Sequence, residues 1–268
     1  MYKRILVPVD GSTFAEQLLA PAAQVARATH SELAILRVVD NAEDHSAAAR
    51  YAQELAAPHG AQAICLPTQL EGVAATIRDE ARRVPGTLVA MCSHGRSGAM
   101  QALMGSVALE VLRALGEPAV VFRPTSEGPP ALSKVGRVVL PLDGSQLSES
   151  IMPQAAALAK WLGGRIIVVS VIEPMVKLGA DVPASDVQES GYVRARAREL
   201  QERYGVEASW EVLHGQPKEA IPSFVRSLGD AMLAMCTHGH TGLRAVIAGS
   251  VTAHCLREAQ VPVFVRVP

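Results

Sequence analysis

The sequence is short of aromatic residues, of net charge and of long apolar runs. Aromatic side chains make up 4% of the 268 residues, and the formal net charge is −1. With few stacking groups and no excess of positive charge, the chain lacks the usual means of holding nucleic acid, so we expect no nucleic-acid partner. The strongest apolar run, Ile166–Ile172, is far too short to span a bilayer, so we expect no membrane partner either.

Cysteines and targeting signals are sparse as well. The four cysteines do not form the disulfide framework of a small secreted protein, because the chain is too long for that class. The first residues lead directly into the apolar run Ile5–Val9, without the long apolar segment and small-residue cleavage site of a signal peptide. These features favour a cytoplasmic protein with reduced thiols.

The sequence does contain an internal repeat. Its first copy holds Ile5-Leu6-Val7-Pro8-Val9-Asp10-Gly11-Ser12, Met91-Cys92-Ser93-His94-Gly95-Arg96-Ser97-Gly98 and Gly105-Ser106-Val107. The second holds Val138-Val139-Leu140-Pro141-Leu142-Asp143-Gly144-Ser145, Met235-Cys236-Thr237-His238-Gly239-His240-Thr241-Gly242 and Gly249-Ser250-Val251. We therefore predict two tandem domains, residues 1–124 and 135–268, joined by a linker at 125–134 that is rich in proline, glycine and polar residues.

Apolar runs alternate with helical patterns in both copies. The predicted strands are Arg4–Val9, Glu32–Val39, Ala61–Leu66, Thr87–Met91 and Ala119–Phe122, then Arg137–Leu142, Arg165–Val171, Glu207–Leu213, Ala231–Met235 and Val263–Val267. The predicted helices run from Ser12 or Thr13 to about Ala28, then Ala47–Ala57, Val73–Arg83, Val107–Leu115, Leu147–Leu162, Val187–Tyr204, Lys218–Leu228 and Val251–Glu258. Continuous apolar strands between helices predict a parallel sheet covered on both faces, which is an α/β fold.

A strand, a glycine-rich loop and a helix follow one another in each copy. Glycines let backbone amides approach a ligand closely, and the serine of each Gly-Ser pair, Ser106 or Ser250, is expected at the N-cap of the next helix. A helix N-terminus offers unpaired N–H groups and the positive end of the helix dipole. Each copy is therefore predicted to bind an anion there, and phosphate is the commonest one.

These motifs resemble the universal stress protein family, whose nucleotide-binding members carry Gly-x2-Gly-x9-Gly-(Ser/Thr). The two copies here read Cys92-x2-Gly95-x9-Gly105-Ser106 and Cys236-x2-Gly239-x9-Gly249-Ser250, with cysteine in place of the first glycine. Pro8-Val9-Asp10 and Pro141-Leu142-Asp143 also resemble the end of the family's first strand. The resemblance covers the whole chain, in tandem.

The resemblance implies two Rossmann-like domains of the adenine nucleotide alpha hydrolase-like type. Each would have a five-stranded parallel sheet of order 3-2-1-4-5, with ATP at the switch point between strands 1 and 4. In the family, fifth strands meet at their edges, so Val120–Phe122 is expected to meet Val263–Val265 in an intramolecular pseudo-dimer. Further homodimerisation is left open.

The resemblance also implies the binding residues and their roles. The aspartates would lie near base and ribose, Val38 and Val171 would meet adenine through their backbone, and the loops would line the phosphates, with Mg²⁺ held by the phosphates. The aspartates are alternatively turn residues, and the valines alternatively core residues. The expected ATP-binding residues are Pro8, Asp10, Val38, Met91, Ser93, His94, Gly95, Arg96, Ser97, Gly98, Gly105, Ser106 and Val107 in domain 1, and Pro141, Asp143, Val171, Met235, Thr237, His238, Gly239, His240, Thr241, Gly242, Gly249, Ser250 and Val251 in domain 2.

The two loops differ in one charge. Arg96 is a fixed cation, whereas its counterpart His240 is mostly neutral at pH 7, so we predict tighter ATP binding by the first copy. His94 and His238 each lie two residues after a cysteine, but this spacing is not a known zinc arrangement. We expect no metal ligand among the protein side chains.

The function predicted from these features is ATP binding by a regulator of the stress response. A slow ATPase is an alternative, although the sequence has no Gly-x4-Gly-Lys-(Ser/Thr) loop and no carboxylate placed to orient a water, so no catalytic residue is assigned. A nucleotide-free interaction module of the same fold is the second alternative. The Gly-x9-Gly-Ser spacing kept in both copies argues against that module.

Overall fold

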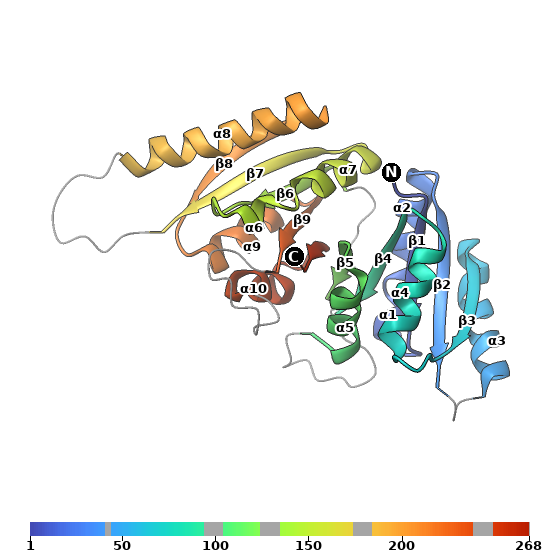
Figure 1. Cartoon of the computed structure of the whole chain (residues 1–268). Helices are drawn as coiled ribbons and strands as arrows, with labels where there is room; N and C mark the ends of the chain where they lie inside the picture. Colours follow the sequence, from blue (N-terminus) through green and yellow to red (C-terminus); the bar gives the residue numbers. More distant parts are fainter. Residues whose placement is uncertain (41–43, 94–103, 124–134, 174–183, 238–248, 268) are drawn as a thin grey trace. The chain divides into compact units, whose positions relative to one another are not determined.

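The computed structural model describes residues 1–40, 44–93, 104–123, 135–173, 184–237 and 249–267 (Figure 1). The chain divides into two compact units, Met1–Lys134 and Val135–Arg266, which are called unit 1 and unit 2 below. Each unit is described by itself.

Unit 1 is a five-stranded parallel sheet with helices between the strands. Its strand order is β3-β2-β1-β4-β5, and every neighbouring pair is parallel. The order 3-2-1-4-5 is therefore confirmed. The elements are β1 (Arg4–Val9), α1 (Thr13–Glu16), α2 (Leu19–Ala28), β2 (Glu32–Val39), α3 (His45–Ala56), a 3₁₀ turn η1 (Ala57–His59), β3 (Gln62–Pro67), α4 (Val73–Arg83), β4 (Thr87–Cys92), α5 (Ser106–Leu115) and β5 (Ala119–Phe122).

Unit 2 repeats this arrangement. Its strands lie in the order β8-β7-β6-β9-β10, again all parallel. The elements are β6 (Arg137–Pro141), α6 (Gln146–Glu149), α7 (Met152–Leu162), β7 (Arg165–Ile172), α8 (Ala184–Tyr204), β8 (Ala208–His214), α9 (Pro217–Leu228), β9 (Ala231–Cys236), α10 (Ser250–Glu258) and β10 (Val263–Arg266).

The helices cover both faces of each sheet. The chain moves outward from β1 to β3 and then crosses back to β4, so right-handed crossovers place the helices before and after this reversal on opposite faces. In agreement, α4 packs against α5, while α3 packs against β2 and β3. In unit 2, α7 packs against α8 and α9 packs against α10.

The inner strands form the cores because most of their residues are apolar. In β2 every residue from Leu33 to Val39 is buried, and in β1 all residues except Pro8 are buried. A strand buried on both faces needs such a run, which is why the bounds predicted for these two strands are confirmed. One arginine, Arg37, lies inside the apolar run of β2 and is 5% exposed.

The first helix of each unit was predicted as one continuous segment, and this was wrong. Unit 1 has α1 ending at Glu16 and α2 beginning at Leu19, and unit 2 has the same break between α6 and α7. Pro21 in α2 and Pro153 in α7 explain both breaks. A proline ring lacks the N–H and clashes with the carbonyl four residues earlier, so the preceding helix cannot continue through it.

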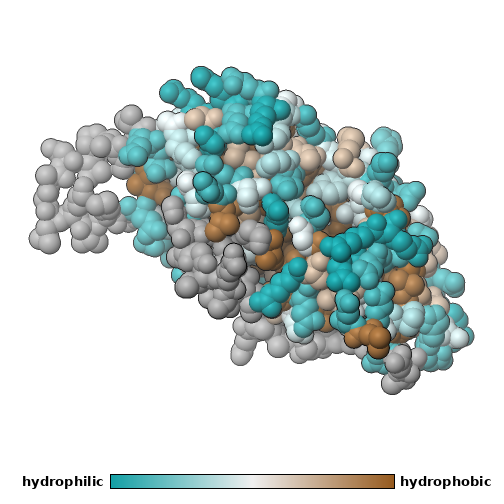
Figure 2. Space-filling view, viewed as in Figure 1, coloured by the Kyte–Doolittle hydropathy of each residue, from teal (hydrophilic) through white to brown (hydrophobic). Residues whose placement is uncertain are grey.

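Helix α8 shows how a single helix divides its faces. Val193, Ala197 and Leu200 are buried at helical spacing, whereas Arg194 and Arg198 are exposed. The outer surface of this helix is accordingly hydrophilic in Figure 2. Among the described residues, no helix combines the length and the apolar character needed to cross a membrane.

Candidate functional site

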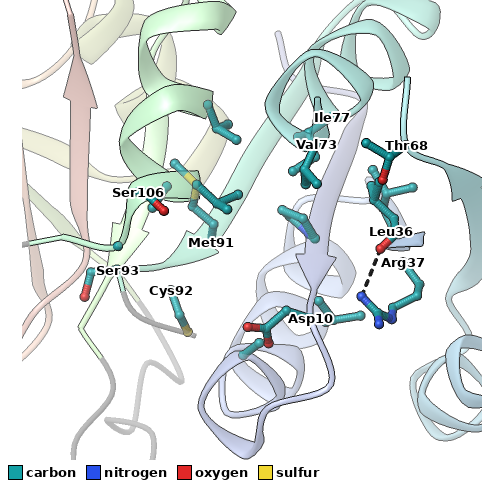
Figure 3. A pocket seen from close by; sticks show the side chains of 18 of the residues that line it. Asp10, Leu36, Arg37, Thr68, Val73, Ile77, Met91, Cys92, Ser93 and Ser106 are labelled. Atoms are coloured by element: carbon teal, nitrogen blue, oxygen red, sulfur yellow. Dashed lines mark hydrogen bonds between the residues drawn. The ribbon is translucent and has the colours of Figure 1, made fainter. Parts of the chain in front are cut away.

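Unit 1 has a cavity of about 410 Å³ at the carboxyl ends of its central strands (Figure 3). The cavity lies where the strand order reverses, since its walls include the ends of β1, β2 and β4 and the start of α5. Ligand sites of this fold class occupy that position, and their volumes usually lie between roughly 300 and 1,000 Å³. The position and the size of the cavity therefore fit a small-molecule ligand.

All of the described residues predicted for domain 1 line this one cavity. These are Pro8, Asp10, Val38, Met91, Ser93, Gly105, Ser106 and Val107. The remaining predicted residues, His94, Gly95, Arg96, Ser97 and Gly98, lie outside the described residues. The structure thus gathers chain segments that are far apart in sequence, and what they bind stays a prediction.

The turn after β1 places a carboxylate in the cavity wall. Asp10 Oδ1 accepts hydrogen bonds from the backbone N of Ser12 at 3.0 Å and from its Oγ at 2.6 Å. Ser12 in turn caps α1, since its Oγ accepts from the backbone N of Ala15 at 3.2 Å. Gly11 has φ +86°, a left-handed conformation that favours glycine. Asp10 is therefore both a turn residue and a cavity residue, and its contact with a ligand stays a prediction.

The start of α5 supplies backbone donors. The first helical hydrogen bond runs from Leu109 N to Gly105 O at 3.2 Å, so the amides of Ser106, Val107 and Ala108 have no partner within the helix. All three of these residues line the cavity. Together with the positive end of the helix dipole, these amides suit an anion.

The predicted N-cap of α5 was one residue too late. The N-cap is Gly105, with φ −63° and ψ 151°, and Ser106 is the first helical residue. Unit 2 has the same arrangement, with Gly249 as the N-cap and Ser250 as the first helical residue. The backbone N of Gly105 donates to Ser93 O at 2.7 Å, which fixes the cap position without a side chain. The serine hydroxyl consequently has no capping role and lies at the cavity edge (Figure 3).

The far side of the cavity was not predicted. Arg37, Asp40, Thr68, Val73 and Ile77 line the rest of the cavity. Figure 3 shows Arg37 and Thr68 across the cavity from Ser106, with Val73 and Ile77 between. The Nη1 of Arg37 donates to Val38 O at 2.9 Å. A sequence signal for Arg37 does exist, because a charged residue inside a buried apolar strand is rare and commonly has a specific role. Thr68, Val73 and Ile77 read as ordinary residues of the loop and helix after β3, so the sequence offers no comparable signal for them.

Unit 2 repeats the framework around its own predicted residues. Pro141 ends β6, Val171 lies in β7, and Met235 lies in β9. Asp143 Oδ1 accepts from Ser145 N at 3.0 Å and from Ser145 Oγ at 2.6 Å, as in unit 1. The backbone N of Gly249 donates to Thr237 O just before Ser250 and Val251 begin α10. The others predicted there, His238, Gly239, His240, Thr241 and Gly242, lie outside the described residues.

The cysteines beside the two sites have protonated thiols at neutral pH. Burial raises the pKa of the Cys92 thiol to about 12, and the nearby Asp10 carboxylate adds to the shift. Cys92 Sγ donates to Phe14 O at 3.0 Å. Burial also raises the pKa of Cys236, whose Sγ lies 3.4 Å from Ser150 Oγ. Both thiols therefore behave as small buried groups rather than as reactive thiolates.

The described residues contain no cluster of three histidine, cysteine, aspartate or glutamate side chains that could hold a metal ion. His94 and His238, for which metal binding was considered, lie outside these residues. The donors around the unit 1 cavity are thus mainly backbone amides, hydroxyls and one guanidinium, which suit an anionic organic ligand.

The parallel sheets and the reversal of strand order define a doubly wound α/β protein, with a cavity beside a helix N-terminus at the switch point of unit 1. A sequence model of the universal stress protein family matches residues 1–71 and 134–268, and the chain belongs to this family. The match leaves out residues 72–133, which include β4 and the start of α5.

Known proteins of this family are similar to the chain. A universal stress protein of Methanocaldococcus jannaschii is 28% identical over 136 residues, which cover 48% of this chain and 80% of that protein. A universal stress protein of Mycobacterium tuberculosis is 29% identical over 182 residues, which cover 66% of this chain and 61% of that protein. The crystal structure of a universal stress protein from Archaeoglobus fulgidus aligns with a TM-score of 0.70 at 19% identity, over 98% of both chains. This last likeness supports the fold of the whole chain.

Proposed function

We propose that the protein binds ATP in the unit 1 cavity and at the equivalent position of unit 2, and that it acts as a nucleotide-dependent regulator of the stress response. The amides at the start of α5 and the Ser106 hydroxyl would hold the phosphates, together with the predicted loop residues 95–98. Asp10 would meet the ribose hydroxyls, and Val73 and Ile77 would pack against the base. Mg²⁺ would be bound through the phosphates.

The observation that carries this proposal is the unit 1 cavity. It joins the N-terminus of α5, where the backbone amides suit an anion, to apolar side chains that include Val73 and Ile77. A nucleotide has the matching division, with charge at one end and an aromatic base at the other. Asp10 lines the same cavity, where its carboxylate would accept hydrogen bonds from the sugar hydroxyls.

Binding alone would give the protein a regulatory output. A ligand that binds only the folded state stabilises that state by mass action, by about 2.7 kcal/mol at a hundredfold excess over its Kd. ATP occupancy would therefore change the stability of each unit, and with it any surface whose order depends on the filled cavity. We propose no catalytic step and assign no catalytic residue.

The test starts with the nucleotide carried by the purified full chain. The protein is denatured, the supernatant is separated by chromatography, and adenine nucleotide per chain is counted. ATP at about one or two equivalents per chain, which would correspond to one or both units being filled, supports the proposal. ADP without ATP would favour slow hydrolysis instead.

An empty preparation calls for calorimetric titration with Mg-ATP. Saturable binding at micromolar to millimolar ATP supports the proposal. Neither heat nor a shift of the unfolding transition at millimolar ATP would overturn it in favour of a nucleotide-free interaction module.

A further inference from the structure

Strand β2 extends beyond its neighbour β1 at the edge of the unit 1 cavity. The β1–β2 pairing ends at Val9 and Arg37, whereas the β2–β3 pairing continues to Val39 and Pro67. The carbonyl of Val39 faces β3, because it accepts from Thr68 N at 2.7 Å. Successive carbonyls of a strand point to opposite edges. The carbonyl of Val38 therefore faces the β1 side, beyond the last residue that β1 pairs there.

Arg37 reaches this carbonyl. Its Nη1 donates to Val38 O at 2.9 Å, and the side chain is buried and lines the cavity (Figure 3). The guanidinium is a donor only, with five N–H groups in a planar fork. At this point of the cavity wall, the positively charged guanidinium of Arg37 thus lies beside the Val38 carbonyl, which already accepts a hydrogen bond from it.

Unit 2 lacks this arginine. Pro141 pairs with Val169 as Pro8 pairs with Leu36 in unit 1, so Ser170 occupies the position that corresponds to Arg37. Ser170 Oγ donates to Glu189 Oε2 of α8 at 2.8 Å. The carbonyl of Val169 accepts from Leu142 N and that of Ile172 accepts from Gly215 N, so the carbonyl of Val171 faces the β6 side. Unit 2 therefore keeps the strand geometry of unit 1 without the guanidinium.

The two arrangements suit different purine bases. Figure 3 shows Arg37 across the cavity from Ser106, and Val38 lines the same cavity. A nucleotide with its phosphates at the start of α5 would therefore place its base toward Arg37 and Val38. The 6-position of adenine carries an amino donor, which needs an acceptor such as a strand carbonyl. The 6-position of guanine or hypoxanthine carries an oxygen, which together with N7 matches an arginine fork.

We propose that Arg37 lets the unit 1 cavity accept 6-oxopurine nucleotides at least as well as ATP, whereas unit 2, with Ser170, selects adenine. This inference rests on the proposed nucleotide-binding function and concerns the selectivity of each site. Arg37 is a specificity-determining residue in this scheme, and Ser170 is its counterpart.

The experiment uses the full chain with the second site blocked by Gly249→Val, and GTP and ATP as the probes. Calorimetry gives the ratio of the two affinities for unit 1. We expect GTP to bind at least as tightly as ATP, and Arg37→Ser, which installs the residue of unit 2, to shift the ratio toward ATP by about tenfold. Arg50→Ser removes the same charge from an exposed position of α3 and should leave the ratio unchanged.

The reciprocal change is made in a chain whose first site is blocked by Gly105→Val. There Ser170→Arg should shift the ratio toward GTP by about the same factor. Arg37→Lys keeps the charge but loses the planar fork, so it should move the unit 1 ratio toward ATP even if Arg37→Ser fails to fold.

The outcomes separate the two proposals. Binding of ATP with a ratio that neither arginine variant moves would overturn this inference and leave the proposed function in place. Strong preference for ATP by the unaltered unit 1 would do the same. Absence of binding by both nucleotides to the wild-type chain would overturn the proposed function and this inference together.

Discussion

The two units keep the same hydrogen bond near the first helix of each repeat and place a different arginine beside it. Tyr51 Oη donates to Glu16 Oε1 at 2.7 Å in unit 1, and Tyr192 Oη donates to Glu149 Oε1 at 2.7 Å in unit 2. Burial and these bonds raise the pKa of both tyrosines well above the usual value. The shared bond ties the second long helix of each unit to the helix after the first strand.

The cation near this bond comes from different elements. In unit 2 it is Arg196 of α8. Its Nη1 lies 3.5 Å from Glu149 Oε2, and its Cζ lies 5.9 Å from the centroid of the Tyr192 ring. In unit 1 it is Arg37 of β2, whose positive charge also acts on Tyr51. Arg37 lines the cavity, whereas Arg196 projects from a helix. The two units thus share the tyrosine–glutamate bond, but only in unit 1 does the arginine near it line the cavity described above.

The largest expected difference between the units concerns the arginine that begins the first strand. Arg4 is buried and donates to Glu80 Oε1 at 2.8 Å and to Glu80 O at 2.6 Å. Its counterpart Arg137 pairs with Asp230, whose side chain is 40% exposed. Breaking a buried ion pair strands a buried charge, so Glu80→Gln should lower the free energy of unfolding by about 3 kcal/mol. Asp230→Asn should cost less than about 1 kcal/mol, because that pair is solvated.

Urea unfolding measures both effects. The chain's two tryptophans, Trp161 and Trp210, both lie in unit 2, so their fluorescence reports that unit while far-UV circular dichroism reports both. Equal costs for the two variants would contradict the comparison. A tryptophan transition that moves fully with Glu80→Gln would show that the units unfold as one.

The next effect is stabilisation by ATP. At a hundredfold excess over its Kd, ATP should stabilise the unit that binds it by about 2.7 kcal/mol. If Arg96 makes the first site bind ATP more tightly, unit 1 should be stabilised at a lower ATP concentration than unit 2. The unfolding of unit 1 is seen by circular dichroism without a change in tryptophan fluorescence, and that of unit 2 by tryptophan fluorescence. The opposite order in an ATP-dependent series of urea curves would reverse the predicted ranking of the sites.

A smaller effect, on ATP affinity, is expected when the N-cap glycine of each proposed site is replaced by valine. Gly105 and Gly249 have φ −63° and −56°, which any residue adopts, so valine at either position adds bulk near the ligand without backbone strain. Each variant should weaken ATP at its own site by at least about tenfold, or ~1.4 kcal/mol, in calorimetry. Gly191→Ala in α8, where a Cβ meets nothing within 4 Å, is the control. ATP affinity untouched by Gly105→Val but abolished by Gly249→Val would mean that unit 2 holds the main site.

The smallest effect compares the equivalent cysteines. Because burial raises the pKa of Cys92 to about 12 and also raises that of Cys236, thiolate is scarce at both sites at pH 8. Ellman's reagent should modify half-buried Cys65 first in the native chain, and all four cysteines in urea. Cys65→Ser should abolish the fast phase. Rapid native labelling of Cys92 would instead favour a redox role for it.

Much of the fold could be predicted because its signals are local. The strands Arg4–Val9, Glu32–Val39 and Ala119–Phe122 have the predicted bounds, since a buried strand requires an apolar run and its ends are marked by polar residues or turns. The helix breaks were missed although their cause, Pro21 and Pro153, is visible in the sequence. Whether a proline begins a helix or interrupts one depends on where the preceding turn ends, which packing decides.

The site was less predictable on its far side. Asp10, Gly105 and Ser106 stand in a recognisable motif, and the structure brings them to one cavity. Thr68 and Val73 reach the same cavity only because β3 and α4 pack beside β2, which no short-range pattern encodes. The N-cap was displaced by one residue because a backbone bond between Gly105 and Ser93, rather than a serine hydroxyl, ends the loop.

Both proposed sites are encoded in a single polypeptide. In a symmetric homodimer, two copies of a site carry identical residues, because one sequence serves both subunits. Here Arg37 and Ser170 occupy corresponding positions in separately encoded strands, so a mutation can alter one site and leave the other intact. Translation nevertheless delivers the two sites in equal number, and no change in expression level can alter that proportion.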